Sequence, residues 1–163
     1  MKIAKIILPV LAVLIIGFVG GALLFGPKDQ ALIEEALDES IRASRQGSAG
    51  GVLDYLSRNL TYDGMPVGNK QDIARVVRSM RPDIVVLDRQ VQMEGENTAK
   101  IVSPVTFKPA MQKEGEPTRI DNVTIVFRKE SGTRWGVIPY PKWRIVEVRA
   151  DGFDPASMFG DIL

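Results

Sequence analysis

Between residues 29 and 82, apolar side chains recur with the 3.6-residue period of amphipathic helices. The first helix is expected to follow Asp29 as its N-cap and to end near Gly47, because small residues follow there. A third helix is predicted over about Lys70 to Met80. Between them lies a second, shorter helix. The positions on the buried faces of the three predicted helices are Leu32, Ile33, Ala36, Leu37, Ile41 and Ser44, then Val52, Leu53, Leu56 and Leu60, then Ile73, Val76, Val77 and Met80.

After Arg81-Pro82 the period changes from 3.6 to 2, which predicts β-strands. Turns are expected at residues 94–97 and at Ser131-Gly132, and the last strand is interrupted by Pro139-Tyr140-Pro141, which should lie at an edge or a bulge because proline lacks an N–H. The predicted inward faces of the strands carry Val85, Leu87, Val91 and Met93, then Ala99, Ile101, Ser103, Val105 and Phe107, then Val123, Ile125 and Phe127.

The chain begins with a basic start and a long apolar run. Residues 6–25 contain no charge, and a helix of that length would span roughly 30 Å, the thickness of a bilayer core. This predicts a single membrane anchor, with a cleaved signal peptide ending at Gly20-Gly21-Ala22 as the alternative. Lys2 and Lys5 predict a cytoplasmic N-terminus and therefore an extracytoplasmic domain.

Composition excludes several kinds of chemistry. The chain of 163 residues is 45% hydrophobic and 25% charged, which suits one globular domain, and it has no Cys and no His. Disulfides, thiolate zinc sites and Cys or His catalysis are therefore excluded. Residues 29–163 carry 18 Lys and Arg against 20 Asp and Glu, a net charge of −2, which does not indicate nucleic-acid binding. Three C-terminal aspartates lack the spacing of a known calcium loop, so no metal or cofactor is predicted.

Two stretches resemble the nuclear transport factor 2-like superfamily, also called SnoaL-like or cystatin-like. "LTYDGMPVGNKQDIARVVRSM" is similar to the segment in which a short first strand turns, at Asp63-Gly64, and the chain then enters the third helix, capped by Asn69 with Asp72. "VTIVFRKESGTRWGVI" and "KWRIVEV" resemble the penultimate hairpin and the last strand of that superfamily. The resemblance covers about residues 29–150.

This resemblance implies an α+β fold in which three helices pack on a curved antiparallel sheet to form a cone. The predicted organisation is an N-terminal basic start and transmembrane helix over residues 1–28, the cone domain over 29–150, and a tail with a possible short helix over 151–163. In that tail Asp154 is expected to cap the helix and Phe153 to pack on Met158.

The superfamily's cone can hold a small apolar ligand, and its ketosteroid isomerases and polyketide cyclases place an Asp, His or Tyr inside it. The candidates for such chemistry are Tyr62, Asp63, Asp88, Asp121 and Tyr140, although Asp63 also fits a turn and Asp88 a solvated face. The aromatic residues predicted to line a ligand pocket are Tyr55, Tyr62, Phe107, Trp135 and Trp143. The alternative for each aromatic residue is an ordinary place in the core.

The sequence therefore favours a membrane-anchored, non-catalytic binding or assembly module. The resemblance implies a place in the bacterial cell envelope, where anchored domains of this fold include scaffold components of type IV secretion systems. A homodimer through the outer sheet face is expected to involve Ile84, Val86, Val102 and Ile138. The alternatives are a pocket enzyme that transfers a proton on a small hydrophobic molecule, and a carrier of a hydrophobic ligand.

Overall fold

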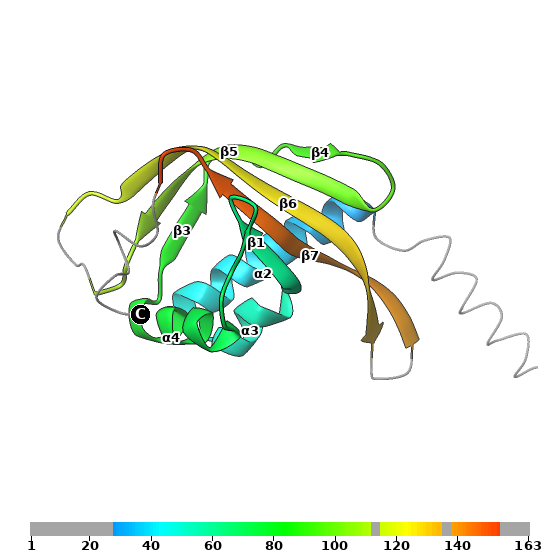
Figure 1. Cartoon of the computed structure of the whole chain (residues 1–163), viewed down its shortest axis with the longest axis horizontal. Helices are drawn as coiled ribbons and strands as arrows, with labels where there is room; N and C mark the ends of the chain where they lie inside the picture. Colours follow the sequence, from blue (N-terminus) through cyan, green and yellow to red (C-terminus); the bar gives the residue numbers. More distant parts are fainter. Residues whose placement is uncertain (1–27, 112–114, 135–137, 154–163) are drawn as a thin grey trace, which may run out of the picture. The chain divides into compact units, whose positions relative to one another are not determined.

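The structure is a computed structural model that describes residues 28–111, 115–134 and 138–153 (Figure 1). The chain divides into two compact units, residues 1–31 and 32–163. Among the described residues, no helix is both long enough and apolar enough to cross a bilayer. The predicted anchor at residues 6–25 and the predicted tail helix after Asp154 lie outside the described residues.

The predicted first and third helices are confirmed. Helix α2 (Asp29–Gln46) is followed by α3 (Ala49–Asp54) and, after two strands, by α4 (Lys70–Met80). The α2 helix ends where Gly47 adopts a φ of 72°, a left-handed conformation that glycine tolerates without strain. The Asn69 side chain caps α4 as predicted, because its Oδ1 accepts a hydrogen bond of 3.0 Å from the Gln71 N–H.

The strands form one mixed sheet, not the purely antiparallel sheet that was predicted. Its order is β2-β1-β7-β6-β5-β3, and β4 also pairs with β5. Every pairing is antiparallel except β1 with β7, which is parallel. The strands are β1 (Leu56–Tyr62), β2 (Met65–Pro66), β3 (Asp83–Val86), β4 (Val91–Met93), β5 (Thr98–Lys108), β6 (Thr118–Arg134) and β7 (Ile138–Ala150).

Two bulges curve this sheet. One lies on β6, where the register with β5 shifts between Ser103 and Val105 and Asn122 adopts a φ of 57°. The other lies on β7 at Val146, where the register with β6 shifts between Val126 and Phe127. Because a bulge adds one residue to one strand, it bends the sheet and exchanges the faces on which later side chains lie.

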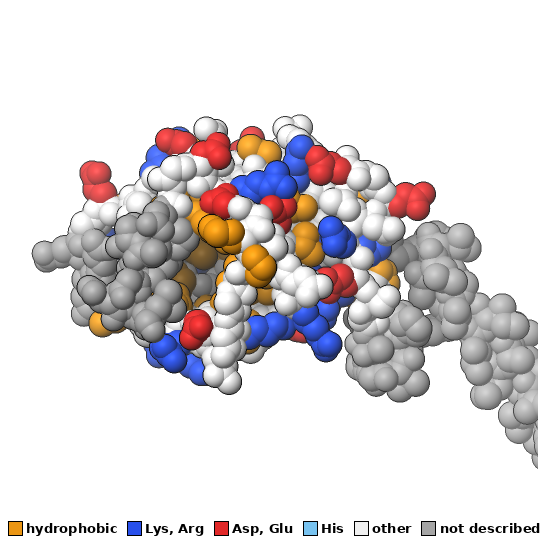
Figure 2. Space-filling view, in the orientation of Figure 1, with side chains coloured by type: hydrophobic (Ala, Val, Ile, Leu, Met, Phe, Trp, Pro, Cys, Tyr) orange, Lys and Arg blue, Asp and Glu red, His pale blue; other side chains and the backbone are white. Residues whose placement is uncertain are grey.

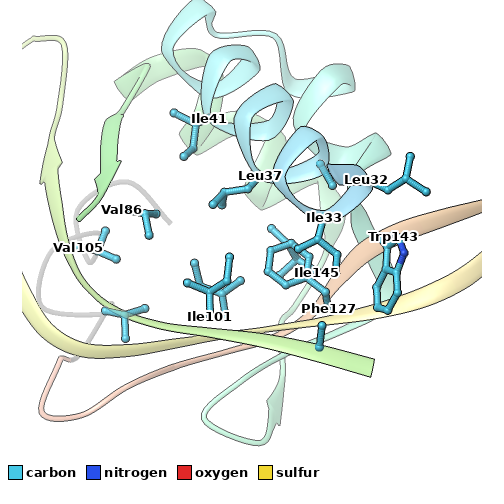
Figure 3. Close-up of a cluster of buried hydrophobic side chains, with 14 of the residues drawn as sticks. Leu32, Ile33, Leu37, Ile41, Val86, Ile101, Val105, Phe127, Trp143 and Ile145 are labelled. Carbon is cyan, nitrogen blue, oxygen red and sulfur yellow. The ribbon is translucent and has the colours of Figure 1, made fainter. Parts of the chain in front are cut away.

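The concave face of the sheet packs on α2 and forms the main core (Figures 1 and 3). Ile33 of α2, Ile101 of β5 and Phe127 of β6 are fully buried there. Figure 3 shows Ile33, Leu37 and Ile41 directed from α2 toward the sheet side chains. A smaller cluster joins α3 to α4 through Ala49, Val52, Ala74 and Val77.

Three local predictions were wrong. Leu56 and Leu60 lie on strand β1 and not on the second helix, which ends at Asp54. On β3, Val86 faces the core and Val85 is exposed, so the predicted inner and outer faces of this strand are exchanged.

The third error concerns Ser131-Gly132, which is not a turn. These residues continue the β6–β7 ladder and pair with Pro141 and Tyr140. A Cβ on Gly132 would lie 3.2 Å from Tyr140 O and 3.3 Å from Lys142 Cβ. The close packing of β6 against β7 therefore explains why residue 132 is a glycine, and a turn is not the reason.

The proline interruption lies on a free edge of β7, as predicted. Strand β1 pairs with β7 from Ile145 onward, where the Ile145 N–H donates to Tyr55 O at 2.9 Å. Alternate residues of a strand direct their backbone groups to the same edge, so Pro139 and Pro141 occupy positions whose N–H would point away from β6. The missing N–H groups therefore cost the β6–β7 ladder nothing.

The turn predicted at Asp63-Gly64 is confirmed. Tyr62 pairs with Met65, and the two residues between them have φ values of 46° and 77°. Positive φ at both positions is the signature of the tight hairpin turn that matches strand twist. This turn places β2 back on β1 and leaves the chain free to reach Asn69 and α4.

Candidate functional site

A cavity of about 240 Å³ lies between α2 and the concave face of the sheet. Figure 2 shows hydrophobic side chains in a hollow between β1 and β3 on the face drawn there. We call this space the cone cavity. Fifteen of the described residues line it: Leu37, Ser40, Ile41, Tyr62, Ile84, Val86, Val105, Phe107, Ile120, Val123, Ile125, Ile145, Val148, Ala150 and Phe153.

Only two of these lining side chains carry a polar atom, Ser40 and Tyr62. The Ser40 hydroxyl donates to Leu37 O at 2.8 Å, one turn back along α2. The Tyr62 hydroxyl donates to Phe153 O at 2.7 Å. Both protons are therefore committed to backbone carbonyls, and the cavity wall is otherwise hydrocarbon.

The candidate carboxylates lie elsewhere. Asp63 shapes the β1–β2 turn, and its Oδ1 accepts a hydrogen bond of 3.2 Å from the Ala150 N–H. Asp88 is exposed and accepts from the Gln90 N–H at 3.0 Å, and Asp121 forms an exposed ion pair of 2.9 Å with Arg119. None of these three lines the cone cavity. The described residues contain no group of His, Cys, Asp and Glu side chains arranged to hold a metal ion.

A second, more polar cleft of about 410 Å³ lies between α2, the end of α3 and β7. The Lys142 ammonium lies 4.6 Å from the centre of the Tyr55 ring and also pairs with Asp54. Burial raises the pKa of the Tyr55 hydroxyl, and the neighbouring Glu39 and Glu35 add to that rise. The cation of this cleft, Lys142, is therefore already paired with a carboxylate of the same cleft, Asp54.

Beside this cleft, Glu130 links β6 to β1 and β7. Its carboxylate accepts hydrogen bonds from Ser57 Oγ at 2.7 Å and from Arg144 Nη1 at 2.8 Å. Burial is the largest single influence on this group and favours the neutral form, but the hydrogen bonds and the Arg144 charge together outweigh it. The pKa of Glu130 therefore lies below its ordinary value of 4.5.

The structure divides the predicted pocket-lining residues between the two sites. Tyr62 and Phe107 line the cone cavity, Tyr55 and Trp143 line the polar cleft, and Trp135 lies outside the described residues. Trp143 is 1% exposed and belongs to the main core as well. Tyr140, a candidate for proton transfer, also lines the polar cleft.

Sequence reasoning missed most of the cavity wall. The wall consists mainly of aliphatic side chains that look like any core residue in the sequence. Alternation along β5 and β6 indicated which face of each strand is buried, and no signal in the sequence marked where the packing would leave a space. Phe153 lines the cone cavity, and Met158, on which it was expected to pack, lies outside the described residues.

Comparison with known proteins identifies the fold. No family model and no curated protein matches the chain. Three similar solved structures are an NTF-2 like protein of unknown function from Shewanella oneidensis, an NTF2-like protein of unknown function in nutrient uptake from Rhodospirillum rubrum, and a ketosteroid isomerase-like protein from Erwinia carotovora atroseptica. Each alignment covers 76% of this chain.

The three alignments have similar TM-scores and similar coverage. The Shewanella protein has a TM-score of 0.56 at 11% identity, with 98% of its chain covered. The Rhodospirillum and Erwinia proteins have TM-scores of 0.54 and 0.52 at 19% and 17% identity, with 97% and 95% covered. The predicted nuclear transport factor 2-like, cystatin-like fold is thus confirmed. Because one fold supports many activities, these identities establish the fold alone.

The Glu130 network predicts a pH-dependent loss of stability. The folded-state pKa of Glu130 is below the unfolded value, so its contribution is present above about pH 4.5 and is lost as the pH falls through the folded pKa. Glu130→Gln should lower the free energy of unfolding by about 1 kcal/mol at neutral pH, because the carboxylate is partly exposed. Urea unfolding at neutral pH and near pH 3 measures both values.

The control is Asp121→Asn, which removes an exposed ion pair and should change stability little at either pH. A Glu130→Gln effect of equal size at both pH values would contradict the assigned role of the ionised carboxylate.

Proposed function

We propose that this domain is a non-catalytic binding module that takes a compact apolar ligand in its cone cavity. The observation that carries the proposal is the wall of the cavity: among the described residues that line it, the only polar side-chain atoms are two hydroxyl oxygens whose protons bond backbone carbonyls. A wall of this kind offers dispersion contacts and burial, and an apolar ligand needs nothing else from it.

The size of the cavity supports a small ligand. Its volume of about 240 Å³ is slightly below the range of about 300–1,000 Å³ that is usual for drug-sized molecules. An apolar space of this kind holds water poorly, because a buried water needs two to four polar partners. A compact apolar ligand would therefore enter this space without displacing strongly bound water.

Proton-transfer chemistry is less well supported by the same wall. A general base must lie within hydrogen-bond reach of the proton that it removes, and the lining contains no carboxylate among the described residues. Similarity to a ketosteroid isomerase-like protein does not change this, since that similarity concerns the fold. Binding without chemistry is thus the function that the site favours.

The test compares the same substitution on the two faces of β5. Val105 is 7% exposed and lines the cavity, whereas Val102 on the opposite face is 39% exposed. Val105→Phe should fill the space and weaken the binding of 1-aminonaphthalene at least about tenfold, or ~1.4 kcal/mol, while Val102→Phe leaves it unchanged. Fluorescence titration of the full chain in detergent measures the affinity.

Equal affinities for Val105→Phe and the unchanged chain would place the probe elsewhere and refute cavity binding. Circular dichroism of both variants checks that the added ring has not unfolded the domain. The same titration in detergent without protein supplies the background from dissolved probe.

The proposal includes attachment to the cell envelope through residues 6–25. These residues carry no charge, and α2 begins at Asp29, only a few residues after the apolar run. A domain tethered so closely would act near the membrane surface, where apolar molecules concentrate.

Charged substitution tests the anchor. Leu14→Arg with Ile15→Arg should release the chain from the membrane fraction, since each arginine at a span centre costs about 2.5–3.5 kcal/mol on insertion scales. Leu14→Ala with Ile15→Ala is the control and should remain membrane-bound after an alkaline wash. A mature chain whose mass shows loss of the first 22 or so residues would instead indicate a cleaved signal peptide.

Self-association through the outer sheet face is also part of the proposal, with a revised set of residues. Ile84 lines the cone cavity and Val86 is 4% exposed in the core, so neither lies on that face as expected, and the side chain of Ile138 lies outside the described residues. Val85, Leu87 and Val102 are 40%, 50% and 39% exposed. Val85 lies opposite Thr106, and the Leu87 N–H donates to Pro104 O at 3.1 Å, so these side chains share one face with Val102. Such a patch favours a protein contact.

Sedimentation velocity tests this contact. The unchanged chain is expected to be a dimer at tens of micromolar, and Leu87→Arg should make it monomeric by placing an unpaired charge in the contact. Met65→Arg, on a residue that is 66% exposed on β2, is the matched control and should remain dimeric. A monomer for the unchanged chain would exclude this interface.

A further inference from the structure

Phe153 differs from the other residues that line the cone cavity. Among the fifteen lining residues in the described part of the chain, it alone lies outside every helix and strand. It follows the end of β7 at Ala150, and its half-buried side chain packs against the main core. Phe153 thus forms part of the cavity wall although it does not belong to a strand of the sheet.

The chain must turn sharply to bring Phe153 to the cavity. Gly152 adopts a φ of 74°, and the Phe153 N–H donates to Ala150 O at 3.2 Å, which closes the turn. The hydroxyl of Tyr62, at the end of β1, then donates to Phe153 O at 2.7 Å. We call this hydrogen bond from Tyr62 to Phe153 the latch.

The base of this turn is well fixed. The Asp63 N–H donates to Val148 O at 2.9 Å, and the Asp63 carboxylate accepts from the Ala150 N–H at 3.2 Å. These bonds attach the β1–β2 turn to the end of β7 and place the Tyr62 hydroxyl where Phe153 O can meet it. Within the described part of the chain, the position of Phe153 itself depends on the turn, the latch and the contacts of one half-buried ring.

Among the described lining residues, Phe153 can therefore move at lower cost than the residues on strands. On the same wall, Ile125 of β6 is paired with both β5 and β7, and Val148 of β7 is paired with both β6 and β1. Moving either residue would disrupt the sheet. Moving Phe153 would break the latch and the hydrogen bond of the turn and leave the sheet intact. Local openings of low cost are expected at such positions.

We propose that Phe153 is a displaceable plug of the cone cavity, and that an apolar ligand binds by expelling its ring and breaking the latch. The inference rests on the proposed function, because it describes how occupation of that same cavity is regulated. Expulsion of the ring enlarges the space available to the ligand. It also couples occupation of the cavity to the position of Phe153.

The coupling works in both directions. A ligand that binds only the open form has its affinity reduced by the fraction of molecules that are open. By thermodynamic linkage, any contact that holds Phe153 out of the cavity raises the ligand affinity by the same factor. The plug would thus connect an apolar ligand to any contact that Phe153 makes in the open form.

Two substitutions separate the plug from the wall. Phe153→Ala removes the ring, and Tyr62→Phe removes only the latch hydroxyl while keeping the ring that lines the cavity. Each should increase the affinity of the full chain for 1-aminonaphthalene. Loss of one net hydrogen bond predicts a gain of about two- to tenfold for Tyr62→Phe. Tyr140→Phe, which removes a hydroxyl outside the cone cavity, should leave the affinity unchanged.

Hydrogen exchange provides a readout that does not depend on affinity. In the unchanged chain, adding 1-aminonaphthalene should accelerate exchange of the Phe153 amide, because the turn to Ala150 opens. In the Tyr62→Phe variant this amide should already exchange faster without the probe. Slower exchange on adding the probe would show that Phe153 closes over the ligand, and the plug would be refuted.

The outcomes distinguish the two proposals. If Val105→Phe abolishes binding while Phe153→Ala and Tyr62→Phe weaken it or leave it unchanged, the cavity binds the ligand and Phe153 is part of the wall. If the unchanged chain and Val105→Phe bind alike, the proposed function fails first. Should Phe153→Ala fail to fold, Tyr62→Phe and the exchange of Phe153 in the unchanged chain still decide the question.

Discussion

The packing of α2 across the concave face of the sheet is the contact on which the rest of the domain depends. Ile33 is fully buried at this contact, together with Ile101 and Phe127. Near Ile33 the sheet supplies large rings, those of Phe127 and Trp143, which fill the space under the helix (Figure 3). Farther along α2, near Ile41, the sheet supplies smaller side chains. The cone cavity lies on this part of the helix, where Val86, Val105, Val123, Val148 and Ala150 line it together with larger side chains such as Phe107.

The buried polar groups already have hydrogen-bond partners, and this explains why the cone cavity suits an apolar ligand. Among the described residues, no buried side-chain nitrogen or oxygen lacks a hydrogen-bond partner. Ser103, 1% exposed on the inner face of β5, accepts from the Asp88 N–H at 2.7 Å and donates to Pro104 O at 2.7 Å. A buried group in need of a partner would have pointed to a polar ligand. The described part of the core contains no such group, which agrees with the apolar ligand proposed above.

Much of the fold could be predicted from the sequence, because its strongest signals are local. Helices with a regular apolar face and a cap, such as α4 after Asn69, were predicted with their observed bounds. The face of β3 could not be predicted, since the apolar run Ile84–Leu87 has no alternation and only pairing with β5 decides which side is buried. Leu56 and Leu60 are four residues apart, a spacing that fits a helix face and a strand face equally well. The parallel partner of β1 is distant in sequence, so no local signal marked it.

The candidate site was less predictable than the fold for a related reason. A cavity is a property of how much volume the surrounding side chains leave unfilled, and an aliphatic residue has the same sequence signature whether it touches a neighbour or borders a space. Tyr62 and Phe107 could be identified as possible lining residues because aromatic rings are few. The position of Phe153 depends on a turn after the last strand and on the Tyr62 hydroxyl at the end of β1. The two stretches are far apart in sequence, and neither indicates that they meet in the fold.

The parallel pairing of β1 with β7 also has a consequence for biosynthesis. Leu56 pairs with Ile145, which the ribosome adds about ninety residues later, roughly 4–18 s at 5–20 residues per second. During that interval α2 has emerged without the two strands that supply Phe127, Trp143 and Ile145, so its apolar face has no native cover. The nascent chain must therefore wait for its final strand before it can close, and the greatest exposure to chaperones and proteases falls in those seconds.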